Sequence, residues 1–237
     1  MDPITDETKA LLRRCSVATL FKQLLKRGLR NTVIQGVRML AQGPELMVGE
    51  AYTLRYIPAR EDLDHLGVFA DPNHPQRKAI ETVPPGHVLV CDCRGDARAA
   101  SAGSILMTRL KMRGAAGFVS DGGLRDSPEI AQLGFPVYFG GPAPQLNLAR
   151  HHAVDANVPI ACGGVAVFPG DILVGDGEGV IVVPRHLAAE VARDAAEQEA
   201  LEEFVIDEVR NGASIVGTYP PKDAALAKYQ EWRKKRK

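Results

Sequence analysis

The chain has 237 residues, 45% of them hydrophobic and 24% charged, which suits one globular domain with terminal additions. Its 29 basic and 29 acidic residues give a formal net charge of zero, so the overall charge makes nucleic acid an unlikely partner. No run of about 18 apolar residues occurs, and the N-terminus lacks a basic segment followed by an apolar one. We therefore expect no membrane span, no signal peptide and a cytoplasmic protein.

The four cysteines predict buried, reduced thiols rather than disulfides. Cys91 and Cys93 lie in an apolar run, and on a strand their side chains would point to the same face. No second closely spaced pair of cysteines accompanies them, which argues against a zinc site.

The N-terminal part of the chain predicts two helices followed by two strands. Thr8 to Arg14 suits a short helix. Ser16 is a good N-cap for a second helix, whose apolar residues recur on one face and which Gly28 ends. Residues 32–40 and 49–56 alternate in the manner of β-strands.

Residues 59–85 are polar and broken, which predicts a loop with short helices. A segment of this length is typical of a lid over a site or of a contact between subunits. It contains His65 and His74, which we expect to be solvated rather than to act as ligands.

The centre of the chain predicts a strand, a helix and a second strand. Residues 88–93 form the first strand, and Arg94-Gly95-Asp96 leaves its end. Residues 104–113 lack Gly and Pro and suit a helix, and 115–120 suit a buried strand that leads into a glycine-rich turn at 121–126. In such a unit the strands run parallel and their ends cluster, so residues 94–96 and 121–126 are expected to lie close together.

Two features of this central stretch can do chemistry. Gly103 and Ser104 open the predicted helix, so free backbone N–H groups there can bind a carboxylate. Arg125 offers a planar fork that matches a carboxylate, and Asp126 offers an oxygen to a hard cation. The structural alternative is that Ser104 is only an N-cap and that Arg125 and Asp126 are only a surface ion pair.

The C-terminal half predicts further strands and a helical tail. After a short helix at 127–133, strands are expected at 136–139 and 153–158, and as a hairpin at 171–183 with an Asp-Gly turn. Residues 160–168 are apolar, and Gly163 and Gly164 inside them indicate a bend or a close backbone approach. The spacing of acids in this hairpin does not fit an EF-hand, and its glycines join strands rather than opening a helix, which excludes a dinucleotide fingerprint. Helices are expected at 187–210 and 222–235.

Several motifs in order resemble the family of 4-hydroxy-4-methyl-2-oxoglutarate aldolases and ribonuclease E activity regulator A, the RraA-like family. Residues 103–126 carry the pattern G-x-x-L-x7-G-x-x-G-x-V-x-D-G-x-x-R-D. Residues 163–171 and 175–180 resemble the closing hairpin of that family. The resemblance covers roughly Ser16 to Val191. It implies an α/β fold, a swivelling β/β/α-type single domain at 1–186, here with an added C-terminal helical tail at 187–237 that would pack on its own or a neighbouring subunit.

The resemblance also implies a site and an assembly. In the family's aldolases, the acid matching Asp126 holds a divalent metal, Mg²⁺ or Mn²⁺, and the arginine matching Arg125 contacts the pyruvate part of a 2-oxo acid substrate. Backbone amides at Gly103, Ser104, Ile105 and Leu106 would bind the substrate carboxylate. Trimers or hexamers with sites between subunits are expected.

One position departs from the family's pattern. The aldolases carry an acid twenty-one residues before the arginine, where this chain has Ser104. A hydroxyl can hydrogen-bond water but is a poor general base near neutral pH. On topology, Asp96 is our best substitute for the missing acid, with Arg94 beside it.

Two classes of function follow. The first is a divalent-metal-dependent carbon–carbon lyase, an aldolase or an oxaloacetate decarboxylase, that acts through a pyruvate enolate; dehydration of a sugar-acid derivative also remains open. The second is a catalytically weak protein that binds and regulates a ribonuclease or helicase. A quinone methyltransferase is disfavoured, because no glycine-rich strand-to-helix cofactor loop of that kind is visible.

Overall fold

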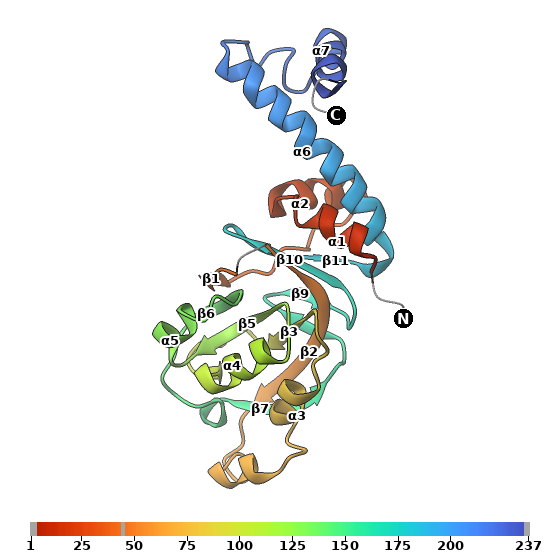
Figure 1. Ribbon diagram of the computed structural model, residues 1–237. Helices are drawn as coiled ribbons and strands as arrows, with labels where there is room; N and C mark the ends of the chain where they lie inside the picture. Colours follow the sequence, from red (N-terminus) through yellow and green to blue (C-terminus); the bar gives the residue numbers. More distant parts are fainter. Residues whose placement is uncertain (1–3, 44–45, 235–237) are drawn as a thin grey trace.

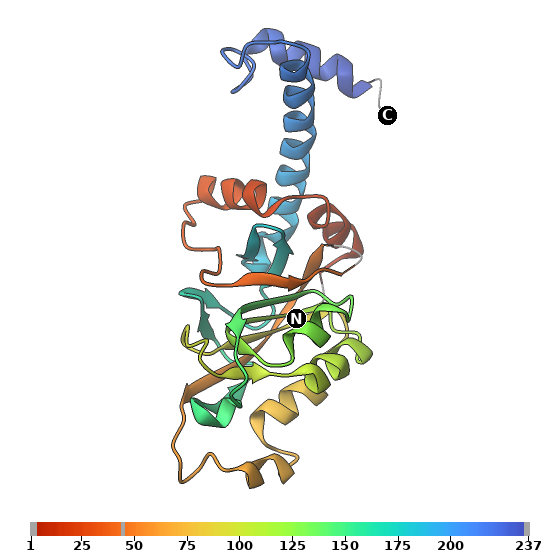
Figure 2. The same ribbon diagram turned by 90° about the vertical axis from the view of Figure 1, so that its left-hand side faces the viewer.

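A mixed β-sheet forms the body of the molecule, and a long helix carries the C-terminal end away from it (Figures 1 and 2). The computed structural model describes residues 4–43 and 46–234. Within them the sheet has the order β1-β6-β5-β3-β2-β10-β11, with β4 beside β5 and β7 beside β2. Its strands are β1 (Arg38–Ala41), β2 (Met47–Pro58), β3 (His87–Asp92), β4 (Ala100–Ala102), β5 (Gly117–Leu124), β6 (Val137–Pro142), β7 (His151–Ala156), β10 (Ile172–Asp176) and β11 (Gly179–Val183).

The centre of the sheet is parallel, as the β-α-β pattern predicts. Strands β2, β3, β5 and β6 run parallel to one another, and helices connect them in order. These are α3 (Pro75–Thr82), α4 (Ser104–Met112) and α5 (Ser127–Ala131). Their apolar side chains, among them Ile80, Met107 and Ile130, pack on one face of the sheet. The short hairpin of β8 (Ile160–Cys162) and β9 (Val165–Val167) packs its apolar side chains against core residues of β2, β3 and β5.

The N-terminal helices cover the β10–β11 end of the sheet. Helix α1 (Asp6–Leu12) and helix α2 (Val17–Lys26) share a core with these strands, and the Ser16 hydroxyl caps α2 by accepting from the Thr19 N–H at 3.1 Å. The predicted cap, the two predicted helices and the predicted β10–β11 hairpin are confirmed.

The C-terminal segment is helical, as expected. Helix α6 (Ala188–Arg210) packs its first turns on α1 and α2, and its far end carries α7 (Asp223–Lys234) through a small separate core. Phe204, Tyr229 and Trp232 belong to that core. The tail therefore packs in part on its own subunit. The boundary at residue 186 and a contact with a neighbouring subunit stay predictions, and Lys235 of the predicted last helix lies outside the described residues.

Several strand boundaries differ from the sequence expectation, and the strand expected at 32–40 is reduced to β1 at Arg38–Ala41. The glycine-rich stretch expected to turn at Asp121 continues β5 as far as Leu124. A Cβ on Gly123 would lie 2.7 Å from the Ala97 carbonyl oxygen, so the glycine serves a close approach between backbones rather than a turn. In the same way β6 continues through its glycines to Pro142, and β7 begins at His151 instead of after it. The three-residue strand β4 was not predicted.

All four cysteines are buried and form no disulfide, as predicted. Burial raises the pKa of Cys15 to about 12, and it raises the pKa of Cys91, Cys93 and Cys162 as well. In the described part of the chain no helix is both long and apolar enough to cross a membrane.

The segment at 59–85 contains a 3₁₀ turn at Leu66–Ala70 and helix α3. His74 is partly buried rather than solvated, with its ring edge-on to Phe69 at 5.5 Å between centroids. His65 lies at the start of the 3₁₀ turn and is exposed. That this segment forms a lid over the site or a contact between subunits stays a prediction.

Candidate active site

A small cavity of about 110 Å³ lies where the start of α4, the end of β5 and the start of α3 meet. Its volume is below the roughly 300 Å³ at which pockets for larger ligands begin, so it suits a small molecule. It is lined by Phe69, Gln76, Arg77, Ala100, Ala102, Gly103, Ile105, Leu106, Arg125, Asp126, Leu146 and Asn147.

The structure brings together the side chains that the sequence singles out at 103–126. Strand β5 ends at Leu124, directly before Arg125 and Asp126, and α4 begins beside them at Ser104. The Asp126 Oδ2 atom accepts a hydrogen bond from the Ser104 N–H at 3.2 Å and one from the Ser104 hydroxyl at 3.3 Å. The Arg125 Nε–H also donates to it, at 3.3 Å. Arg125 and Asp126 thus form an ion pair at the N-terminus of α4, where Ser104 also contacts Asp126, and not an isolated surface pair.

Gly103 makes this arrangement possible. A Cβ at this position would lie 2.7 Å from Asp126 Oδ2 and 2.9 Å from Arg125 Cγ. Its backbone is extended, with φ −136°, so the requirement is for space and not for an unusual conformation. Gly103, rather than Ser104, holds the N-cap position of α4. The alternative in which Ser104 is only an N-cap is therefore wrong.

The Asp126 carboxylate is ionised, and one of its two oxygens accepts no hydrogen bond from the described residues. Its pKa lies below the ordinary value, chiefly because the Ser104 N–H donates to it and then because Arg125 lies beside it. Within residues 4–43 and 46–234, no hydrogen bond reaches its Oδ1 atom. Asp126 also has a left-handed backbone, with φ 56°, and occupies the N-cap position of α5.

The first turn of α4 supplies further donors. The N–H groups at the start of a helix have no carbonyl of their own helix to bind, and that of Ser104 is taken by Asp126. The groups of Ile105 and Leu106 follow it at the cavity wall. Together with the positive end of the helix dipole they suit a carboxylate, as the sequence predicts.

Asp96 and Arg94 are not among the side chains that line this cavity. The Asp96 carboxylate accepts from Arg98 and from Arg150, each at 2.8 Å, and these guanidinium groups hold its pKa far below the ordinary value. The Arg94 guanidinium donates to the Arg150 carbonyl at 3.2 Å. Within one subunit, Asp96 therefore already has two arginine partners. Whether it replaces the acid that is missing at Ser104 stays untested.

Sequence reasoning missed the lining residues that lie outside the stretch 103–126. Phe69, Gln76 and Arg77 come from the segment 59–85, and Asn147 comes from the 3₁₀ turn Asn147–Ala149. No motif marks these residues, and the only available signal was the length of the segment, which suggested a lid.

The described residues contain no group of three or more His, Cys, Asp or Glu side chains that could hold a metal ion. The donor set at the cavity is one carboxylate, Asp126, with a hydroxyl, Ser104, beside it. Such a set fits Mg²⁺ or Mn²⁺ in the manner of sites that keep several waters and use substrate oxygens as ligands. It does not fit a closed structural site for zinc.

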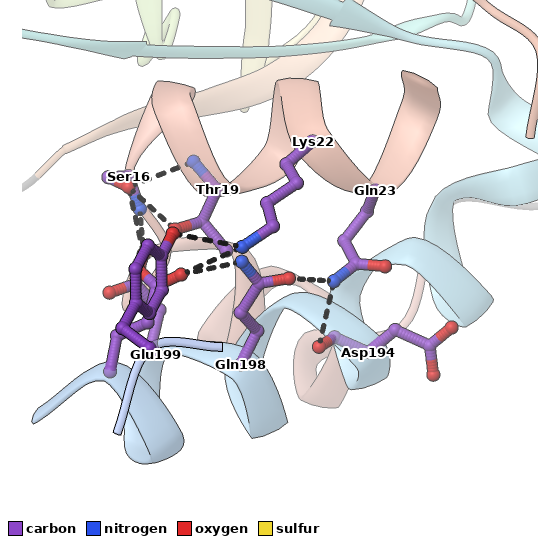
Figure 3. A network of polar contacts seen from close by, with 9 residues as sticks. Ser16, Thr19, Lys22, Gln23, Asp194, Gln198 and Glu199 are labelled. Atoms are coloured by element: carbon purple, nitrogen blue, oxygen red, sulfur yellow. Dashed lines mark hydrogen bonds and ion pairs between the residues drawn. The ribbon is translucent and has the colours of Figure 1, made fainter. Parts of the chain in front are cut away.

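A larger groove of about 810 Å³ lies between α2, α6 and residues 219–221, but its polar groups satisfy one another (Figure 3). Lys22 pairs with Glu202 at 3.1 Å, and the Gln23 amide donates to Gln198. The Glu199 carboxylate accepts from both the N–H and the hydroxyl of Ser16, at 2.8 Å each. We interpret this network as the connection that fixes α6 to α2.

Comparison with known proteins gives one family match. Residues 14–182 match the model of the family described as RraA-like, Aldolase/RraA. A protein of Halalkalibacterium halodurans, provisionally named a 4-hydroxy-4-methyl-2-oxoglutarate aldolase, is 38% identical over 137 residues, which are 56% of this chain and 64% of that protein. The chain thus matches less than two thirds of the length of that relative. A Thermus thermophilus protein named 4-hydroxy-4-methyl-2-oxoglutarate aldolase is 32% identical over 119 residues, 50% of this chain and 71% of that one.

A solved structure shares the fold over most of the chain. Streptomyces coelicolor RraAS2, described as an unusual member of the RNase ES inhibitor RraA protein family, superposes with a TM-score of 0.75 and 34% identity. The match covers 86% of this chain and 98% of that one. The predicted mixed α/β class with a helical C-terminal segment is therefore confirmed.

Proposed function

The chain belongs to the RraA-like (Aldolase/RraA) family, and from that premise we propose that it is a divalent-metal-dependent carbon–carbon lyase acting on a small 2-oxo acid. The observation that carries the proposal is the arrangement at Gly103. Here a free helix start, a guanidinium and an ionised carboxylate face one small cavity. The names of the aldolase relatives support the lyase class.

The chain's own residues would bind and orient the substrate. The N–H groups of Ile105 and Leu106 would donate to the carboxylate of the 2-oxo acid, and Arg125 would hold the same end of the molecule. When the C3–C4 bond breaks, its electron pair moves into the substrate's C2–C3 bond and negative charge develops on the C2 oxygen. Arg125 stabilises that charge, which is the enolate of pyruvate.

Asp126 would hold the metal through Oδ1, which has no hydrogen-bond partner in the described chain. A bound Mg²⁺ or Mn²⁺ would supply Lewis-acid polarisation of the substrate's oxygens. Ser104 and Arg125 fix the carboxylate from its other oxygen, Oδ2, so Oδ1 can be presented to a cation without reorganising the site. No second carboxylate lines the cavity among the described residues.

The absence of a second carboxylate bears on the type of cleavage. Retro-aldol cleavage needs a base to remove the proton of the 4-hydroxyl group, whereas decarboxylation of oxaloacetate breaks the C3–C4 bond without such a base. Ser104 stands where the aldolases carry an acid, and its hydroxyl is a poor base near neutral pH. We therefore favour decarboxylation over aldol cleavage, unless a neighbouring subunit supplies the base.

A homo-oligomer is part of the proposal. The cavity lies at the surface, and the side chain of Ile105 on its edge is 78% exposed. A neighbouring subunit that covers this edge would exclude water and complete the site. A trimer or hexamer of the kind that the family resemblance implies would provide such a neighbour.

The second candidate is a regulator that binds a ribonuclease. The description of RraAS2 supports it, and a lost acid at Ser104 would be consistent with lost catalysis. Against it, a pure binding protein needs neither the cavity nor the cradle that Gly103 provides for Asp126.

The test is pyruvate release from oxaloacetate and from 4-hydroxy-4-methyl-2-oxoglutarate, each with Mg²⁺, Mn²⁺ or EDTA. We expect metal-dependent release from oxaloacetate at least, lost in Asp126→Asn and retained in the control Asp62→Asn, which alters an exposed ion pair on a surface loop. Release that survives EDTA, or that Asp126→Asn leaves intact, would count against the mechanism. No release from either substrate would favour the regulator.

A further inference from the structure

Arg77 is a second cation at the cavity and comes from a different segment of the chain than Arg125. It lies near the start of α3, and it lines the same 110 Å³ space. Arg125 has a carboxylate partner, Asp126, at 3.3 Å. For Arg77, by contrast, no acidic side chain lies within ion-pair distance anywhere in residues 4–43 and 46–234. A guanidinium that faces a cavity without an anion is a candidate for binding one.

The position of Arg77 is fixed from two sides. Its guanidinium stacks over the ring of Phe69, with 4.5 Å from Cζ to the ring centroid. Its neighbour Gln76 is 2% exposed and donates to the Ser101 carbonyl at 2.7 Å, which ties the start of α3 to strand β4. Stacking leaves the edge of the guanidinium, with its N–H groups, available to an oxygen ligand.

Asn147 adds an independent observation at the same cavity. Its side chain is 4% exposed, and its amide nitrogen has no hydrogen-bond partner among the described residues. A buried amide without a partner is costly, and a ligand oxygen would remove that cost. The turn that carries it is also tied to β4, because the Ala100 N–H donates to the Gln145 carbonyl at 2.8 Å.

Strand β4 therefore connects the segments that carry the residues lining the cavity. At Ala102 it leads into Gly103 and the helix start beside Arg125 and Asp126. At Ala100 and Ser101 it contacts the segments that carry Asn147 and Arg77. The cavity thus holds one set of groups that suits a 2-oxo acid, at Gly103 and Arg125, and a second set that suits another anion, at Arg77 and Asn147.

We propose that Arg77, supported by Phe69 and assisted by Asn147, binds the distal carboxylate of a 2-oxo diacid and so selects diacids over monoacids. The inference rests on the proposed function for the placement of the 2-oxo acid end at Arg125. Arg77 is a specificity-determining residue in this scheme: it contacts the carboxylate at the end of the substrate that does not carry the 2-oxo group, which in oxaloacetate is the group that leaves as CO₂. A charge-assisted hydrogen bond of this kind corresponds to about a tenfold to a hundredfold preference in affinity.

The experiment compares two ligands of equal chain length that differ only in the terminal carboxylate, 2-oxoglutarate and 2-oxopentanoate. Their binding is measured by calorimetry in the full-length protein with Mg²⁺ present. Wild type is expected to bind 2-oxoglutarate at least about tenfold more tightly. Arg77→Met should abolish that preference without changing the affinity for 2-oxopentanoate, and Arg77→Lys should restore part of it because the charge remains while the fork is lost.

The matched control is Arg109→Met. Arg109 lies on α4 and pairs with Glu81 at 2.7 Å on the surface, so its loss should leave the preference intact. Thermal melting of each variant shows whether it has folded. No preference in wild type, a preference that persists in folded Arg77→Met, or no binding of either ligand overturns the inference.

The outcome also separates this inference from the proposed function. If the diacid preference depends on Arg77 but oxaloacetate yields no pyruvate, the lyase proposal fails and the carboxylate site stands. If pyruvate release depends on Asp126 but the two ligands bind alike, the lyase proposal stands and Arg77 has no part in selection.

Discussion

Replacement of Gly103 by alanine should separate activity from stability. The added Cβ would lie 2.7 Å from Asp126 Oδ2, and Cβ contacts are ordinary only from 3.4 Å, so the carboxylate must retreat by about 0.7 Å. The Ser104 N–H bond, already 3.2 Å long, would then be lost. Because misplacement by about 1 Å at a reacting centre costs on the order of a hundredfold, we expect kcat/KM for pyruvate release to fall at least about tenfold.

Stability should change little. Loss of the hydrogen bond costs about 1 kcal/mol, and the alanine restricts the unfolded chain by roughly 0.4–1 kcal/mol in the opposite direction. The backbone of Gly103 is extended, so alanine adds no strain there. The melting temperature is therefore expected within a few degrees of wild type.

The assay measures kcat/KM for oxaloacetate, Mn²⁺ affinity by titration, and thermal melting in the same preparation. The matched control is Gly177→Ala, because a Cβ on Gly177 would meet no atom within 4 Å. If Gly103→Ala kept both the rate and the Mn²⁺ affinity within about twofold of wild type, the reasoning that Gly103 makes room for the Arg125–Asp126 pair would be refuted.

Three further outcomes are expected. Ser104→Asp should tighten Mn²⁺ binding, since it places a second carboxylate beside Asp126, and should lower the melting temperature of the metal-free protein by like-charge repulsion; unchanged Mn²⁺ affinity would contradict this. Asp96→Asn should lower the free energy of unfolding by about 1–3 kcal/mol near pH 7. The pKa of Asp96 is lower in the folded than in the unfolded state, so its stabilisation is present above the unfolded-state pKa of about 3.9. In denaturant titrations, the difference in unfolding free energy between wild type and Asp96→Asn should therefore be constant from about pH 5 to 8 and shrink only below about pH 4. Phe204→Ala should release α7 and expose residues 211–222 to limited proteolysis while pyruvate release persists; an unchanged digest would argue against the small core as the anchor of α7.

The parts of the fold that local chemistry determines could be predicted from the sequence. The Ser16 cap, the helix ended by Gly28 and the Asp-Gly hairpin each depend on a few neighbouring residues. The parallel order of β3, α4 and β5 follows from the general geometry of β-α-β units. These signals were strong because sequence pattern and tertiary structure favour the same result.

The predictions of turns and strands were wrong where a residue's conformation depends on contacts with segments far away in the sequence. Glycines that make a turn and glycines that permit close backbone approach look alike in sequence, and only the carbonyls of Ala97 and Ala99 against Gly123 distinguish them. Asp121, placed by sequence in a turn, is instead 4% exposed in β5 and accepts from the N–H groups of Gly95 and Gly163. Burial raises the pKa of its carboxyl group above the ordinary value.

The candidate site divides in the same way. Residues 103–106 and 125–126 could be predicted because one β-α-β unit and one motif contain them all. Arg77 and Asn147 could not, since they reach the cavity from separate segments through contacts with β4 that no local pattern encodes. Asp96 was assigned by topology alone, and nothing in the sequence indicates that Arg150, 54 residues away in the chain, donates to its carboxylate.

The backbone conformation at Asp126 bears on the cation-holding role that we propose for this side chain. A non-glycine residue in the left-handed region costs about 1 kcal/mol, although aspartate tolerates it better than most residues. The ion pair with Arg125 contributes about 0–1 kcal/mol and the two hydrogen bonds from Ser104 about 1 kcal/mol each, and all of them depend on the carboxylate. Glycine at this position would relieve the strain at the loss of the carboxylate. A carboxylate fixed through Oδ2, with Oδ1 unbonded in the described chain, fits the cation-holding role that we propose for Asp126.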